Sequence, residues 1–304
     1  MVDRPKKPSA IPVTPVAPAP QVNISTDNDR VSATLPTGES VEVLLYGATI
    51  ISWKSGGKEN LFLSEKAHLD GSKAVRGGIP VVFPVFGPPP ANHATSSLAQ
   101  HGFARTSRWE FLGKSTSESR SRANSTGDAG VTLDFGLYSS NLSDEAKKAW
   151  PYEFGLVYSV TLGKDGLETA VNVRNEGKQT FDFQLLLHTY LRVEDISQVG
   201  ISGLDKHSYV DKVDKAAIKT ETENPVTITS ETDRVYKSLG DATITVSEKG
   251  KPRFEVFRDN LDDVVVWNPW IEKANGIADF GPEDGWKNMS AFESFLFLIS
   301  LASS

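Results

Sequence analysis

The chain has 304 residues, with 32 Lys and Arg against 39 Asp and Glu, and it contains no cysteine. The resulting net charge of −7 excludes the basic field that gathers nucleic acid, and the lack of thiols excludes disulfides, cysteine nucleophiles and thiolate metal sites. The longest apolar run covers only 295–299, against the ~20 residues that a membrane helix needs. We therefore expect a cytoplasmic protein with neither a nucleic acid nor a membrane as its partner.

The first 21 residues contain six prolines separated mainly by small and basic residues. Such a segment cannot bury a core and favours extended conformations of the polyproline type. We expect a proline-rich tail over residues 1–21 and a single folded domain over residues 22–304.

From Val31 onward, short apolar runs alternate with turn residues, as at 163–166 and 175–178. Alternation over so many short runs predicts antiparallel strands. Only residues 143–150 predict a helix, with Ser143 as its N-cap and Pro151 as its stop, and residues 115–130 predict a flexible loop. The expected fold is all-β: a large antiparallel β-sandwich with very few short helices.

A glycine- and proline-rich stretch begins at Arg76 and ends at Arg105. Its prolines disfavour a helix, whereas Gly77, Gly78 and Gly102 allow close backbone approaches. This pattern predicts an irregular rim that aims both arginines at one place, and guanidinium groups suit a phosphate or carboxylate ligand. On residue type alone, two arginines that bridge surface carboxylates are the more common arrangement.

The run from Thr180 to Val193 predicts a long strand. With a period of two, His188 shares a face with Gln184 and Tyr190, opposite the apolar side. Such a polar face favours the lining of a cleft, although a lone strand histidine is more often structural.

Two further stretches are candidates for a site. Glu293 is embedded in an apolar run, and an isolated carboxylate is costly to bury unless it has partners or a catalytic role. Trp267 and Trp270 lie around Pro269, where indole rings could cover a sugar or pack at a rim. The five histidines form no HExxH or other metal motif, so no metal and no cofactor are expected.

Taken together, five ordered motifs resemble the glucose-6-phosphate 1-epimerases, which are relatives of the galactose mutarotases. The resemblance spans about residues 25–293. The motifs are RGGIPVVFPVFG at 76–87, QHGFAR at 100–105, LHTY at 187–190, ETDRVY at 231–236 and VVWNPWIEK at 265–273.

The resemblance implies a β-supersandwich and the interconversion of the α and β anomers of a hexose 6-phosphate. We also expect the protein to be a monomer. It implies that His188 is the general acid and Glu293 the general base. Its substrate-binding positions correspond to Arg76, Gln100, His101, Arg105 and Asp233.

After Glu293 the chain departs from the family pattern, and residues 295–301 either replace the closing strand or leave it absent. A catalytically weak protein that binds or senses sugar phosphates is therefore the alternative function. Glycoside hydrolysis fits less well, because no second acid accompanies Glu293 in the matched motifs.

Overall fold

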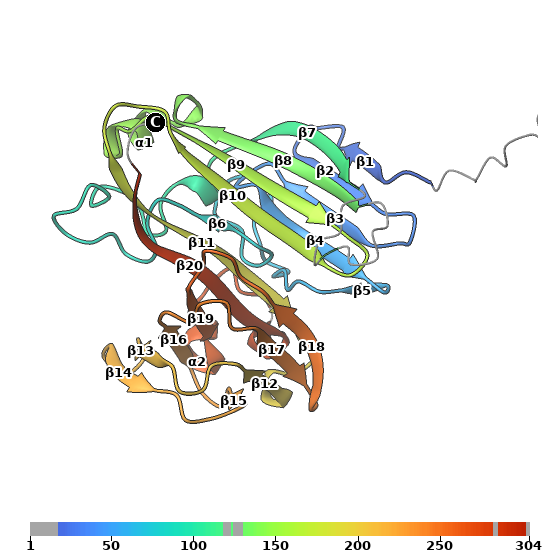
Figure 1. Cartoon of the computed structure of the whole chain (residues 1–304), viewed down its shortest axis with the longest axis vertical. Helices are drawn as coiled ribbons and strands as arrows, with labels where there is room; N and C mark the ends of the chain where they lie inside the picture. Colours follow the sequence, from blue (N-terminus) through green and yellow to red (C-terminus); the bar gives the residue numbers. More distant parts are fainter. Residues whose placement is uncertain (1–17, 118–122, 124–129, 282–284, 302–304) are drawn as a thin grey trace, which may run out of the picture.

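The computed structural model describes residues 18–117, 123, 130–281 and 285–301, and its strands greatly outnumber its short helices (Figure 1). All strand pairs within its four sheets are antiparallel, which confirms the predicted all-β fold. No helix among these residues is long and apolar enough to cross a membrane.

Two sheets are formed by strands within residues 21–175 and lie together in the upper part of Figure 1. Burial alternates along their strands, most clearly in β9, because valine, tyrosine and leucine side chains point into a shared core. The five-stranded sheet has the order β1 (Gln21–Ile24), β2 (Arg30–Thr34), β3 (Ser40–Leu44), β4 (Thr49–Ser55), β5 (Lys58–Glu59), and the four-stranded sheet has the order β10 (Leu167–Asn175), β9 (Phe154–Leu162), β8 (Gly130–Tyr138), β7 (Glu110–Ser117).

Two further sheets are built mainly from the second half of the chain. The longest strands, β11 and β20, are neighbours in the seven-stranded sheet and run between the two groups of strands in Figure 1. The seven-stranded sheet has the order β14 (Ala217–Thr220), β13 (Ser208–Asp211), β16 (Thr232–Tyr236), β19 (Asp263–Asn268), β20 (Met289–Leu301), β11 (Phe181–Arg192), β6 (Val81–Val82), and the smaller sheet has the order β15 (Val226–Thr227), β12 (Val199–Ser202), β17 (Ile244–Glu248), β18 (Lys251–Val256).

The predicted short helix is present as α1 (Asp144–Ala149). The side chain of Ser143 accepts a hydrogen bond from the Ala146 N–H, so the expected N-cap is confirmed. A second helix, α2 (Trp270–Asn275), was not predicted, and short 3-10 helices cover Ala104–Thr106, Ser139–Asn141, Ile196–Gln198 and Gly285–Asn288.

The predicted loop at 115–130 is wrong for its first residues, because β7 continues to Ser117 and pairs there with Gly130. Residues 118–122 and 124–129 lie outside the described part of the chain.

The end of the chain completes the sheet. Strand β20 pairs with β11 along its length, from Met289 opposite Arg192 to Leu301 opposite Phe181. The sequence left open whether residues 295–301 replace the closing strand or leave it absent. The pairing with β11 shows that they replace it.

Strand β11 also borders two hydrophobic cores. Leu185 and Leu187 belong to the core shared with β8 and β9, whereas Leu191 and Val193 belong to the core shared with β12, β17 and β19. Packing from both cores holds the middle of β11 in place.

Candidate active site

Two aromatic rings stack on one face of β11. The rings of His188 and Tyr190 have centroids 4.4 Å apart and planes 3° apart, and the Tyr190 hydroxyl lies 3.3 Å from Nε2 of His188. Their backbone N–H groups donate to the carbonyls of Pro80 and Gly78, which belong to the predicted rim. Both side chains are buried, so this polar face is enclosed by other elements.

Glycines bring the rim close to the strands behind it. Gly78 has φ +68°, and a Cβ there would lie 2.1 Å from the carbonyl oxygen of Ile50. Gly102 has φ +66°, and a Cβ there would lie 2.2 Å from the carbonyl oxygen of Phe83. Any other residue would have to push these backbones apart, so the close approaches predicted from the sequence are confirmed.

Arg76 reaches the stacked rings from this rim. Its Nη1 lies 3.5 Å from the Tyr190 hydroxyl, at the limit of hydrogen bonding, and its Nε donates to Oδ1 of Asp279 at 3.2 Å. The guanidinium thus pairs with a carboxylate, as residue type alone suggested, yet it does so beside His188. Asp279 and the contact with Tyr190 were not predicted.

His101 approaches His188 from the other side of the rim, with ring centroids 6.4 Å apart. Its Nδ1 accepts a hydrogen bond from the Gly87 N–H at 3.2 Å, so in the neutral ring the proton belongs on Nε2. Burial, together with the positive charge of Arg105 and the neighbouring His188, lowers the pKa of His101 to about 2. A pKa this low keeps His101 neutral at physiological pH, which makes it a poor candidate for a protonated general acid.

Gln100 and Arg105 flank His101. The Gln100 side-chain nitrogen lies 3.3 Å from Nε2 of His101, and because both nitrogens would donate, this contact is not a hydrogen bond in the tautomer with the proton on Nε2. The Arg105 Nη2 donates to the Gln100 backbone carbonyl at 3.1 Å. Arg105 thus contacts the residue next to His101, whereas Arg76 contacts the Tyr190 hydroxyl beside His188.

Asp233 enters the same region on β16. Its Oδ1 lies 3.7 Å from the Lys212 ammonium, which sits 4.3 Å above the Phe86 ring. Phe86 in turn lies 5.6 Å from His101, between ring centroids. Lys212 is thus a third cation at this face, which the sequence did not identify because it follows a strand end in an ordinary charged turn.

The two tryptophans of β19 and α2 play different parts. Trp267 meets His188 and Tyr190 edge-on, at centroid distances of 6.2 and 6.3 Å. Trp270 instead packs on Trp286 at 4.5 Å. Of the two indoles, Trp267 is therefore the one that contacts His188 and Tyr190.

Glu293 lies on β20, whose register places it directly opposite His188. On its other side it pairs with Val265 of β19. Residues directly opposite in an antiparallel pair have Cβ atoms about 4.5–5.5 Å apart. The backbone therefore brings together the two positions that the sequence predicted as acid and base.

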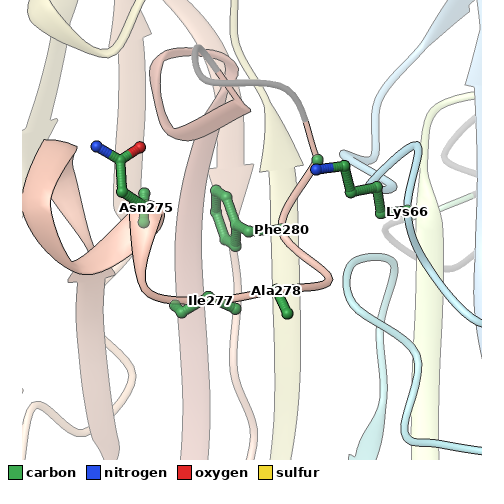
Figure 2. A pocket seen from close by; sticks show the side chains of 7 residues that line it. Lys66, Asn275, Ile277, Ala278 and Phe280 are labelled. Atoms are coloured by element: carbon green, nitrogen blue, oxygen red, sulfur yellow. The ribbon is translucent and has the colours of Figure 1, made fainter.

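A separate hollow of about 540 Å³ is lined in part by Ala278 and Phe280, the residues on either side of Asp279 in the chain. In Figure 2, Phe280 stands between Asn275 and Lys66 at this hollow. None of the predicted site residues lines it, and among the described residues that do, Lys66 is the only charged one. The candidate active site is therefore the group formed by His188 and Tyr190 on β11 with His101 and Arg76 beside them, which we call the histidine cluster. Among the described residues, no group of three or more His, Asp or Glu side chains is placed to hold a metal ion.

Comparison with known proteins places this fold in a class. A crystal structure from Salmonella typhimurium, described as a "putative mutarotase", is similar over 95% of this chain and 91% of its own, with a TM-score of 0.77 and 27% identity. The fold is thus that of the mutarotase class of sugar isomerases.

The chain belongs to the aldose 1-epimerase family, whose model matches residues 29–298. Two curated relatives are both named "Putative glucose-6-phosphate 1-epimerase". The protein from Cenchrus ciliaris is 34% identical over 83% of this chain and 73% of its own, and the protein from Escherichia coli is 34% identical over 82% of this chain and 77% of its own.

Proposed function

We propose that this protein interconverts the α and β anomers of a hexose 6-phosphate, with glucose 6-phosphate as the expected substrate. The observation that carries the proposal is the pairing of His188 with Glu293 across β11 and β20. O1 and O5 of a pyranose are both bonded to C1, so a base at one and an acid at the other must be close neighbours. The names of the two curated relatives support the choice of substrate.

In the proposed reaction, the Glu293 carboxylate takes the proton of the O1 hydroxyl while protonated His188 gives a proton to O5. The C1=O1 double bond forms and the C1–O5 bond breaks, which leaves an open aldehyde with a hydroxyl on C5. The aldehyde turns about the C1–C2 bond. On reclosure, neutral His188 takes the proton from O5 and Glu293 returns its proton to O1, which restores both groups.

His101 acts beside this pair as a neutral group. Because its pKa is lowered to about 2, chiefly by burial, it stays uncharged and donates a hydrogen bond from Nε2 to a sugar oxygen. Gln100 and Asp233 supply further polar contacts to the hydroxyl groups. Trp267 covers an apolar face of the ring.

The phosphate of the substrate lies near the ring oxygen, because C6 and O5 are both bonded to C5. A cation that binds the phosphate should therefore lie close to the acid that serves O5. Arg76 meets this condition, since its Nη1 and Nε2 of His188 lie 3.5 and 3.3 Å from the same Tyr190 hydroxyl. Arg105, whose Nη2 donates to the backbone carbonyl of Gln100 next to His101, is the second proposed phosphate ligand.

Exchange NMR between the anomeric protons of glucose 6-phosphate tests the proposal. Accelerated exchange with glucose 6-phosphate, and weaker acceleration with glucose, is the expected result. Binding without accelerated exchange would refute the enzyme and favour the sugar-phosphate sensor. A monomeric state and a cytoplasmic location stay predictions from the sequence, which gel filtration and cell fractionation can test.

A further inference from the structure

Asp279 is a charged residue beside the histidine cluster, and no role has yet been assigned to it. It comes from the segment after α2, and the sequence separates it from Arg76 by 203 residues. Its side chain is only 18% exposed, and it accepts a hydrogen bond from Nε of Arg76 at 3.2 Å. The fold therefore brings a carboxylate from a distant segment to the side of a proposed phosphate ligand.

The segment that carries Asp279 is anchored at two points. The Ser64 hydroxyl donates to the Asp279 carbonyl at 2.7 Å. The next residue, Phe280, is buried between Phe62, at 5.7 Å, and Trp267, at 6.2 Å. Because the backbone is held on both sides, the carboxylate is a fixed point against which the Arg76 side chain can be oriented.

Orientation matters because the guanidinium is a rigid plane. With Nε held by Asp279, Nη1 is directed at the Tyr190 hydroxyl, which contacts Nε2 of His188. A guanidinium has five N–H donors, so the two contacts leave donors in the same plane for an anionic ligand. The ion pair between Arg76 and Asp279 thus orients the Arg76 N–H groups that remain for the phosphate. It also orients the Arg76 N–H that contacts the Tyr190 hydroxyl beside His188.

The carboxylate also has an electrostatic cost. It neutralises part of the Arg76 charge and repels a phosphate dianion, so a residue selected only for tight phosphate binding would not be acidic. A carboxylate at this position is expected if the orientation of Arg76 in the reacting complex contributes more to the rate than a higher affinity for the phosphate would.

We propose that Asp279 is a positioning residue, which orients Arg76 and, through Tyr190, the imidazole of His188. The proposal rests on the proposed epimerase function. Asp279 contacts neither of the reacting oxygens, and its effect is expected in kcat rather than in KM.

The test compares Asp279→Ala with Asp279→Asn by exchange NMR on glucose 6-phosphate, with Lys66→Ala as the control. Asp279→Ala should lower kcat by at least about 10-fold and leave KM equal or lower, because a misplaced group is costly for reaction and a repulsive charge is gone. Asp279→Asn keeps an oxygen that accepts from Nε, so it should restore most of kcat. Lys66 lines the hollow beside the same segment, and its replacement should change neither constant.

A purely structural role would give a different pattern. It would lower the melting temperature of Asp279→Ala while kcat per folded molecule stayed at the wild-type value, which would overturn the proposal. Equal kcat losses in Asp279→Asn and Asp279→Ala would overturn it as well. If Asp279→Ala does not fold, Asp279→Ser takes its place under the same criteria.

A second comparison uses Arg76→Lys, which lacks the Nε donor. In that background Asp279→Ala should add little to the loss of kcat, whereas a full additional loss would contradict the proposed route through Arg76. A wild-type protein without any exchange activity would refute the epimerase function itself. An active wild type whose kcat is indifferent to Asp279 would refute only the positioning role.

Discussion

Replacing Arg76 by alanine should separate phosphate recognition from sugar chemistry. In the proposed complex, Arg76 makes charge-assisted hydrogen bonds to the phosphate, and these are worth about 1.5–3 kcal/mol. Since about 1.4 kcal/mol corresponds to a factor of ten, the loss of these bonds alone should lower kcat/KM for glucose 6-phosphate by about 10- to 100-fold. The upper end is favoured because Arg76→Ala also leaves the Asp279 carboxylate without its partner, where it repels the phosphate.

Glucose lacks the phosphate and should be affected much less. On glucose, the variant loses no ligand contact, but it loses the orienting effect on Tyr190 and His188 that Asp279→Ala also removes. The loss on glucose should therefore be about the 10-fold expected for Asp279→Ala, and the loss on glucose 6-phosphate should exceed it by the factor that the phosphate contacts contribute.

Exchange NMR on both sugars measures the two losses in the same samples. Arg76→Lys is the matched control, because it keeps the charge and removes the planar fork, and it should recover part of the activity on glucose 6-phosphate only. Thermal melts establish that each variant is folded. Equal losses of kcat/KM on the two sugars would refute the assignment of Arg76 to the phosphate.

Two further predictions concern the rim and His101. Gly102→Ala should be strongly destabilising, by roughly 1–2 kcal/mol for the left-handed backbone and roughly 1–3 kcal/mol for the clash with the Phe83 carbonyl. Gly240→Ala, at φ +56° with no atom within 4 Å of the new Cβ, should show only the first part, and equal melting temperatures for the two variants would contradict this account. The pKa of His101 is lowered to about 2, chiefly by burial, so below about pH 6.5 the unfolded chain binds a proton that the folded chain excludes. The wild type should therefore lose stability relative to His101→Gln as the pH falls from 7 to 4, and a constant difference in melting temperature over that range would show that His101 titrates normally.

Much of the fold could be predicted from local patterns. The alternation along β11 indicated which side chains share a face with His188, and the Ser143 cap and Pro151 bracketed α1. These features depend on the two-residue alternation of a strand and on residues adjacent to the element, and both can be read from the sequence. Helix α2 also left local signals, namely Pro269 before it and Gly276 after it, but the aromatic run around them resembles the end of a strand.

The site was only partly predictable, because its ion pairs join distant segments. Nothing near Asp279 in the sequence indicates that it meets Arg76, and Lys212 reaches Asp233 only because β13 and β16 pair in the same sheet. The register of β11 and β20 is likewise a property of the whole sheet. The resemblance to a family supplied the roles of His188 and Glu293, and the fold supplied their adjacency.

The central claim is that His188 and Glu293 act together on one sugar ring. A double-mutant cycle on the anomeric exchange rate of glucose 6-phosphate, with His188→Ala, Glu293→Gln and the double variant, tests it most directly. If the two groups serve a single proton-transfer step, each single variant should lose on the order of 100- to 10,000-fold and the double variant should be little worse than the poorer single. Losses that simply multiply in the double variant, or a Glu293→Gln variant as fast as the wild type, would contradict the account.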